Sequence, residues 1–297
     1  MNWSLQKIGA AADRVQQMDV ASTLAVMMLL TILLFAELTW VIVVPITILA
    51  LAGILFEGFR TDPRLWCLLT ALMGVALYWD WYPQDNHQYL FVYMCLMLFC
   101  VFHIEDDRRQ AVLATSSRWL LGAVMAAAVI WKLSTPDYLS GAFFHHGLIT
   151  HHTLHGMAVA VGDVAPETIV QNQTETAWLY FSYLTESPET SIYLEGGERV
   201  GAIAAFLTWW TLGVEGLLAA LFLWPDRLGG RHRLVFYARH VTLMLFILAV
   251  YPLAPVIGFG WALIMLAYGS CVGQQTRFRV LYPALFLLLI FVGYVGL

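Results

Sequence analysis

The sequence predicts an all-α fold, a bundle of membrane-spanning helices, and three observations carry this prediction. Hydrophobic residues make up 60% of the 297 residues, and charged residues only 12%. A soluble domain is about half apolar and about a quarter charged, so the excess apolar side chains must face lipid. The apolar residues also come in separate runs close to the ~20 residues that a helix needs to cross the hydrocarbon. Finally, the basic residues gather at alternate ends of these runs.

Nine apolar runs follow a polar N-terminal arm, residues 1–19, which we expect to be an interfacial helix or disordered. The runs cover residues 21–36, 40–56, 65–81, 89–104, 118–133, 201–223, 234–251, 256–272 and 280–296. Two stretches are too long for one crossing, so we divide the first at Glu37–Thr39 and the second at Pro252–Pro255, where prolines favour a turn. The sequence therefore predicts nine spans, or eight, in a single membrane domain of residues 20–297.

Arginine and lysine residues predict the orientation of these spans. With the N-terminus in the cytoplasm, all of the 15 basic residues except Lys132 and Arg199 fall in cytoplasmic segments. This asymmetry follows the positive-inside rule and places the N-terminus inside and the C-terminus outside. The longest connection, residues 134–200, then lies outside. Its many aromatic residues predict interfacial or re-entrant helices that cover the outer ends of the spans.

Other sequence features narrow the class of protein. No small-residue cleavage site follows the first apolar run, so we expect no secretory signal peptide. The four cysteines lie in apolar runs without a CxxC pair, which is typical of small buried side chains. The sequence contains no nucleotide-binding loop, GxSxG or HExxH, and nothing indicates a nucleic acid partner. An Asn-Gln-Thr sequon begins at Asn172 and matters only in a host that glycosylates secreted proteins.

Lys132 and His87 are polar residues at predicted outer ends of spans. Lys132 ends the fifth run beside Trp131. A lysine there commonly snorkels to the interface, but the other outer ends carry almost no basic residues. Desolvation disfavours the ammonium form and can make the amine a base. His87 begins the fourth span on the same side, where it either anchors a helix end or lines a site, oriented by Asp85. Asn86 is placed to cap the helix that begins near Gln88.

Glu215 lies inside the sixth span, about two turns from its predicted cytoplasmic end. An ionisable residue at such a depth faces protein or a cavity rather than lipid. It is therefore either a hydrogen-bonded packing residue or part of a site wall or proton path. His240, in the next span, is its candidate partner.

Five histidines gather in the segment HHGLITHHTLH of the predicted outer region. On a helix, His155 would share a face with His151, four residues before it, or with His152, three residues before it. Two nitrogens on one face are what a metal site requires, but no carboxylate within the run completes a ligand set. We expect a structural or interfacial role and no metal, with His151, His152 and His155 as the candidate ligands should one bind.

Four elements, in the same order, resemble the membrane domain of vitamin K-dependent γ-carboxylases, which defines the HTTM family. The matched elements are an Asn-His-x-Tyr-Leu motif, a helix ending in Lys-Leu, a helix with an acidic residue and a helix with a histidine. Their residues here are Asn86, His87, Tyr89 and Leu90, then Lys132 and Leu133, then Glu215, and then His240. A tryptophan and a glycine of the family correspond to Tyr138 and, one residue late, to Gly141. The resemblance covers residues 20–273.

The resemblance implies that Lys132 is a catalytic base tied to oxidation of a quinol such as vitamin K hydroquinone, and that His87 lines the same outward-facing site. The pocket expected around them contains Asn86, Asp85, Tyr89, Trp131, Glu215 and His240. The carboxylases engage protein substrates through a large lumenal domain, whereas this chain stops at Leu297. We therefore expect a compact relative in the bacterial cytoplasmic membrane rather than a carboxylase that recognises a propeptide.

Two functions stay open at the level of sequence. The first is a carboxylase-like, lyase-like or quinol-dependent enzyme that modifies a peptide or small substrate. The second is a non-catalytic membrane subunit or maturation factor for a secreted peptide, working with a small soluble partner outside the cytoplasm. A transporter ranks below both, because no pair of broken helices occurs in matching halves of the chain.

Overall fold

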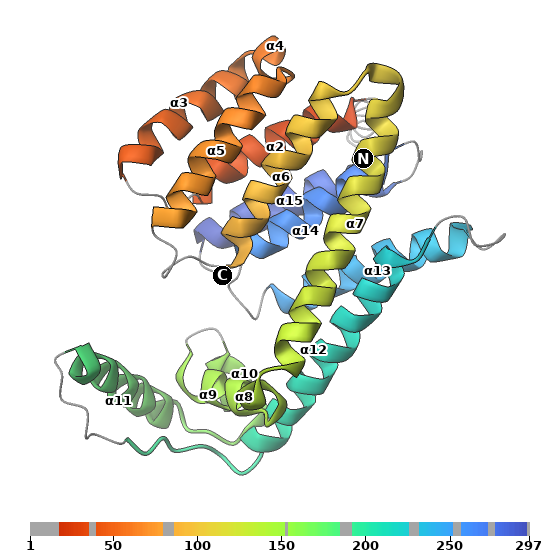
Figure 1. Ribbon diagram of the computed structural model, residues 1–297. Coiled ribbons are helices and arrows are strands. Elements are labelled where there is room, and N and C mark those ends of the chain that lie inside the picture. Colours follow the sequence, from red (N-terminus) through yellow and green to blue (C-terminus); the bar gives the residue numbers. More distant parts are fainter. Residues whose placement is uncertain are drawn as a thin grey trace, which may run out of the picture. The chain divides into compact units, whose positions relative to one another are not determined.

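The computed structural model describes residues 18–35, 40–79, 86–151, 154–184, 192–225, 232–251, 257–272 and 277–295. Within these ranges every regular element is a helix, which confirms the predicted all-α class (Figure 1). In the described part, three helical segments are long and apolar enough to cross a membrane: α7 (Asp106–Leu133), α12 (Val200–Leu223) and Arg233–Val250 of α13 (His232–Val250). They indicate a membrane protein, whereas nine spans and their orientation stay predictions.

The other predicted spans are also helices, although their described apolar segments are shorter. They are α2 (Val20–Phe35), α3 (Trp40–Leu55), α5 (Pro63–Trp79), α6 (Asn86–His103), α14 (Ile257–Ser270) and α15 (Phe278–Val295), with the single turn α4 (Glu57–Arg60) after α3. α7 begins at Asp106, well before the apolar run that starts at residue 118. Its first turn contains Asp106 and Asp107, and acidic side chains stabilise the N-terminus of a helix. Our two division points, Glu37–Thr39 and Pro252–Pro255, lie outside the described residues.

The chain divides into two compact units, one with the residues up to Gly122 and from Val256 onward, the other with Ala123–Pro255. In the first unit, α14 packs against α2, α6 and α15. Its residues from Gly260 to Gly269 are all buried, as expected of a helix that is apolar on every side. The single membrane domain of residues 20–297 stays a prediction from the sequence.

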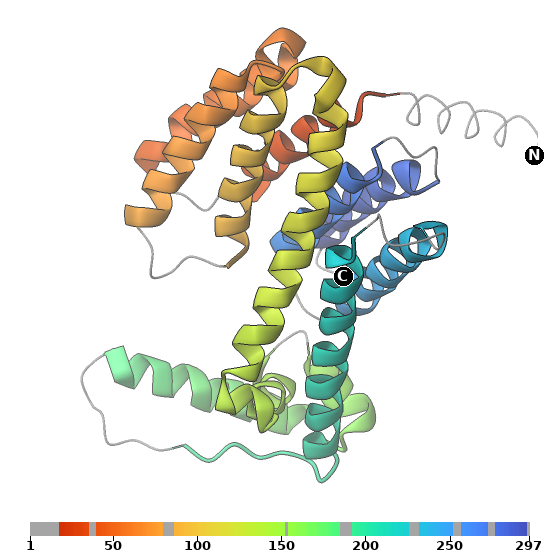
Figure 2. The same cartoon turned by 45° about the vertical axis from the view of Figure 1, so that its right-hand side comes forward.

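In the second unit, the region predicted at 134–200 folds into helices near the start of α12 (Figure 2). These helices are α8 (Pro136–Leu139), α9 (Ala142–Thr150), α10 (His155–Val161) and α11 (Pro166–Leu184). Of these, α9 packs on α12 and the others pack on α9. We call these helices, the described residues that connect them and the first turns of α12 the helical module. Its buried core consists of Leu148, Ile149, Ala158, Val164, Ile169, Val200 and Ala204. The region is helical as predicted, and its position at a membrane surface stays a prediction.

Asn172 of α11 ties three parts of the helical module together. Its Nδ2 donates to the carbonyl oxygens of Ile149 (3.2 Å) and Glu195 (2.7 Å), and its Oδ1 accepts from the backbone N–H of Glu195 (3.0 Å). The side chain is buried, and both of its polar atoms are bonded. The sequon that begins here is therefore not open to glycosylation in the folded chain.

Arg239 of α13 caps the C-terminal end of α12. We assigned this arginine to a cytoplasmic turn from the sequence, but its side chain is buried and donates to the carbonyl oxygens of Leu221 and Trp224. The last carbonyls of a helix lack partners within the helix and carry partial negative charge, so a guanidinium group stabilises them. Arg239 therefore joins α12 to α13 in addition to any role in topology.

Candidate functional site

Lys132 and Glu215 form a buried ion pair in the second unit. Lys132 is the last residue but one of α7, and its Nζ donates to Oε1 of Glu215 on α12. The side chains of Lys132 and Glu215 are 15% and 7% exposed. Both residues were site candidates from the sequence, but the partner that we expected for Glu215 was His240. The structure brings the lysine to the carboxylate instead.

The pattern of burial along α12 explains why Glu215 points inward. Buried positions recur every three or four residues and form one stripe along the helix, as packing against neighbouring helices requires. They are Val200, Ala204, Thr208, Thr211, Leu212, Glu215, Leu218, Ala219 and Phe222. Since Glu215 lies on this stripe, its carboxylate is directed into the unit and away from the exposed face of the helix.

The ion pair corrects the depth that we assigned to these residues from the sequence. Lys132 was placed at the outer end of a span and Glu215 near the cytoplasmic end, yet two side chains in contact must lie at about the same depth. At about 1.5 Å per residue, Glu215 lies about 22 Å along α12 from Val200. The explanation is that Val200 and Ala204 belong to the core of the helical module. The first turns of α12 therefore contribute to the helical module, and the depth of Glu215 in a membrane stays a prediction.

Tyr138 of α8 covers one side of the ion pair. The Nζ atom of Lys132 lies 5.3 Å from the centroid of the Tyr138 ring, within cation–π distance. The Tyr138 hydroxyl donates to Oγ1 of Thr211 (3.1 Å), one turn before Glu215 on α12. The pKa of Tyr138 is raised to about 12, mainly by burial and to a smaller extent by the charge of Glu215, against a lowering by the hydrogen bond to Thr211. Tyr138 is therefore a neutral group near pH 7.

The chain turns directly after Tyr138, at Gly141. Gly141 has φ 81, a left-handed conformation that favours glycine, and precedes α9. A Cβ atom here would also lie 3.6 Å from the backbone nitrogen of Ala205, so the turn lies close to α12. The sequence pointed to Tyr138 as an aromatic residue of the outer region and as a family correspondence, and to Gly141 as a family correspondence, but Thr211 was not among the predicted site residues. The signal for Thr211 was its spacing of four residues from Glu215 on one helix face.

The second carboxylate oxygen of Glu215, Oε2, is buried and has no hydrogen-bond partner among the described residues. Most buried polar atoms in proteins are hydrogen-bonded, and an unsatisfied one costs about 1–3 kcal/mol. Oε2 is therefore a buried acceptor whose capacity to form a hydrogen bond is unused among the described residues.

His87, on α6, packs within the first unit. Its ring contacts the edge of Phe91, with centroids 5.6 Å apart. A Cβ atom at position 258 would lie 2.6 Å from its Cδ2 atom, so Gly258 at the start of α14 leaves the space that the imidazole occupies. His87 and Lys132 belong to different units. The predicted pocket that they share stays a prediction.

The structure describes some of the other predicted pocket residues. Tyr89, on α6, and Trp131, beside Lys132 on α7, are both exposed. Asp85 and the side chain of Asn86 lie outside the described residues. Asn86 is the first residue of α6, close to the start near Gln88 that we expected from the sequence.

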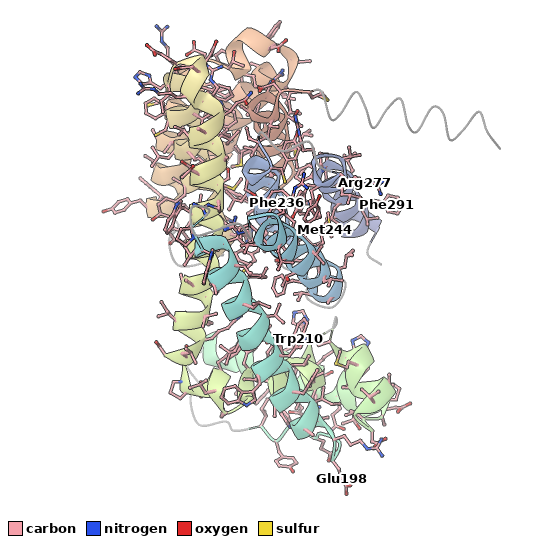
Figure 3. All side chains as sticks on the ribbon, turned by 90° about the vertical axis from the view of Figure 1, so that its right-hand side faces the viewer. Glu198, Trp210, Phe236, Met244, Arg277 and Phe291 are labelled. Carbon is pink, nitrogen blue, oxygen red and sulfur yellow. The ribbon has the colours of Figure 1, made fainter. Side chains whose placement is uncertain are left out.

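His240, on α13, is buried among aromatic rings. Its ring centroid lies 4.4 Å from that of Phe236 and 6.0 Å from that of Phe222. Figure 3 labels Phe236 on α13, and Trp210 on α12 between the start of the helix and Glu215. The surroundings of His240 thus include the rings of Phe236 and Phe222, while Oε1 of Glu215 accepts from Lys132.

Among the residues that the structure describes, no group of three or more His, Cys, Asp or Glu side chains is arranged to hold a metal ion. This holds for the described histidines of the segment as well. His152 lies outside this part of the chain. His146 places Nδ1 3.3 Å from the Thr150 hydroxyl. Nδ1 of His155 is buried without a hydrogen-bond partner in the described part. His151 and His155 are joined by a backbone hydrogen bond of 3.1 Å at the start of α10.

No protein-family model matches this chain, and neither the curated proteins nor the solved structures include a match.

Proposed function

We propose that this chain is an enzyme of the bacterial cytoplasmic membrane, similar to the HTTM domain of vitamin K-dependent γ-carboxylases, in which Lys132 acts as a base on a peptide or small substrate. The observation that carries the proposal is the buried ion pair of Lys132 and Glu215, with one carboxylate oxygen unpartnered. A buried ion pair costs desolvation energy that apolar side chains of similar volume would avoid. Such a pair is therefore a candidate for chemistry rather than for stability alone.

A lysine can act as a base only after its ammonium group has lost a proton, and Glu215 is the acceptor for that proton. As an ammonium ion Lys132 cannot accept a proton. Transfer of its proton to Glu215 gives a neutral amine beside a neutral carboxylic acid, and burial favours these neutral forms. The amine can then take a proton from an acidic C–H or O–H group of the substrate. The ammonium ion formed stabilises the substrate anion, while Tyr138 covers the group on one side.

A quinol such as vitamin K hydroquinone fits one feature of this group, because a phenolic hydroxyl can donate to the unpartnered Oε2 of Glu215. When bound, a quinol would supply reducing equivalents. The part of Lys132 and Glu215 would be to hold and move the proton beside it.

Amine reactivity tests the proposal without knowledge of the substrate, because lysine occurs only at positions 7 and 132. In a Lys7→Arg background, the full chain in detergent micelles is labelled with trace acetic anhydride at increasing pH, and acetylation of Lys132 is followed by mass spectrometry. If Glu215 accepts the proton, Glu215→Gln will change the pH at which Lys132 becomes reactive. Identical profiles would show that Glu215 does not control the amine.

The host provides the second readout. Lys132→Ala should remove the peptide or small-molecule product that distinguishes cells with the protein from cells without it. Arg64→Ala, which removes an exposed charge in the other unit, is the matched control and should leave the product unchanged. A stably produced Lys132→Ala protein that still forms the product would exclude the lysine mechanism.

The helical module favours a second candidate, a non-catalytic membrane subunit that binds a secreted peptide. The module has its own buried core, yet it exposes large aromatic side chains, among them Phe143, Trp178 and Tyr193. Exposed aromatic residues are common at protein interfaces. A soluble partner that co-purifies equally with the wild type and Lys132→Ala, but is lost with Trp178→Ala, would support this function. Loss of the partner with Lys132→Ala alone would contradict it.

A further inference from the structure

An open groove of about 700 Å³ lies between α10 and the first turns of α12, entirely within the second unit. Its volume is within the range of about 300–1,000 Å³ that is typical of sites for small organic ligands. Six of the seven side chains that line it are apolar, and the seventh is Arg199. The lining residues are Met157, Ala160, Val161, Arg199, Ala202, Ile203 and Phe206.

The apolar surface of the groove continues along α12. Phe206 is 65% exposed, and Trp209 and Leu217 follow it on the exposed face of the same helix. α12 is also one of the helices long and apolar enough to cross a membrane. The exposed face of such a helix lies against lipid or protein, because exposing so large an apolar surface to water is unfavourable. A hydrocarbon chain can therefore follow this face from the bilayer into the groove.

One exposed ion pair marks the end of the groove. Arg199 Nε lies 3.1 Å from Asp163 Oδ2, and both side chains are mostly exposed. A guanidinium group has five N–H donors, so one contact to Asp163 leaves donors for a phosphate oxygen. The Asp163 carboxylate can in turn accept from an ammonium group. The pair offers one positive and one negative group side by side, as a zwitterionic headgroup requires.

We propose that the groove binds a phospholipid with a phosphoethanolamine headgroup, with one acyl chain between α10 and α12, its phosphate on Arg199 and its ammonium on Asp163. This site is separate from the Lys132–Glu215 group and does not depend on the proposed chemistry. It would fix the helical module to one leaflet, because the headgroup holds α10 at the level of the lipid phosphates.

Photocrosslinking of the full chain in nanodiscs of phosphatidylethanolamine and phosphatidylglycerol tests the site. Trace phosphatidylethanolamine carries a diazirine on its acyl chain, and crosslinked peptides are mapped by mass spectrometry. Ala202→Trp fills the groove and should lower crosslinking to α10 at least tenfold. Val170→Trp, at an exposed position of α11 that does not line the groove, is the matched control and should leave crosslinking unchanged.

The headgroup contact is tested by Asp163→Asn. Asp163 has φ 57, a left-handed conformation that asparagine tolerates well, so this variant keeps the backbone and removes only the charge. It should lower the ratio of ethanolamine to glycerol lipid crosslinks several-fold. Equal crosslinking of α10 in the wild type and Ala202→Trp would mean bulk lipid only. An unchanged lipid ratio in Asp163→Asn would likewise overturn the proposal, even if Ala202→Trp were to misfold.

Discussion

Two ion pairs in the second unit use the same kinds of charge in opposite surroundings. Lys132 and Glu215 have side chains that are 15% and 7% exposed, whereas those of Arg199 and Asp163 are 68% and 60% exposed. An exposed pair contributes about 0–1 kcal/mol, because water solvates both charges almost as well when they are apart. Removing one partner of a buried pair costs about 3–5 kcal/mol, because the charge that remains is neither solvated nor neutralised.

The difference shows that burial, more than residue type or distance, determines what an ion pair does. The exposed pair can exchange its partner for another charged group at little cost, which suits a contact with a headgroup. The buried pair cannot exchange partners without leaving a buried charge uncompensated. The predictions below test this contrast, from the largest expected effect to the smallest.

Replacing Lys132 by methionine should have the largest effect on stability. Lys132→Met keeps the length of the side chain and leaves Glu215 uncompensated, so we expect the free energy of unfolding in detergent micelles to fall by about 3–5 kcal/mol. The double variant Lys132→Met with Glu215→Leu should recover most of this loss, because no buried charge remains. Denaturant titration followed by circular dichroism measures both. A loss below about 1 kcal/mol in the single variant would mean that the pair behaves like an exposed one.

Asn172 tests whether burial has the same consequence for a neutral group. Asn172→Ala removes three hydrogen bonds and leaves backbone groups of Ile149 and Glu195 unpaired, so we expect a loss of about 1–3 kcal/mol. Thr174→Ala is the control, because its exposed hydroxyl donates to the Val170 carbonyl of the same helix, which is its one bond to the described residues. The same unfolding measurement applies. Equal effects of the two substitutions would show that the Asn172 contacts do not stabilise the helical module.

Much of the fold could be predicted because its signals are local. Each predicted apolar run overlaps a described helix, since a run of about 20 apolar residues determines a helix by itself. Helix ends were less predictable: α7 begins with polar residues that an apolar pattern does not detect. The helices of the module were expected as a group, but their bounds were not. α8, α9 and α10 have fewer than ten residues each, and tertiary packing rather than periodicity defines such short helices.

The candidate site was predictable as a set of residues but not as an arrangement. Lys132 and Glu215 were recognisable because charged residues are rare in apolar runs. Their pairing was not, because 83 residues separate them and no local rule connects α7 to α12. His240 was chosen as the candidate partner because the sequence places it at a similar depth in the next span, and no feature of the sequence distinguishes it from Lys132. Packing of Val200 and Ala204 in the helical module is likewise a contact between distant segments that no local pattern predicts.

Tyr138 should contribute less to the free energy of unfolding than the buried ion pair does. Tyr138→Phe keeps the ring over Lys132 and removes the hydrogen bond to Thr211, which should cost about 0.5–1.5 kcal/mol. The folded chain raises the pKa of Tyr138 from 10.0 to about 12. The stability that depends on its neutral hydroxyl is therefore complete below pH 10 and is lost as the pH rises through 12. Unfolding curves over this window should converge for wild type and Tyr138→Phe, and parallel curves would contradict the assigned contacts.

The exposed pair should show the smallest effect. Arg199→Gln removes a charge that water solvates well, so we expect the free energy of unfolding to change by less than about 1 kcal/mol. Added salt screens exposed charges, so even this difference should shrink between low and high ionic strength. The loss in Lys132→Met should stay nearly constant over the same range, because ions do not reach a buried pair. Paired unfolding curves at two salt concentrations make the comparison. If salt weakened both effects equally, the contrast in burial between the two pairs would not hold in solution.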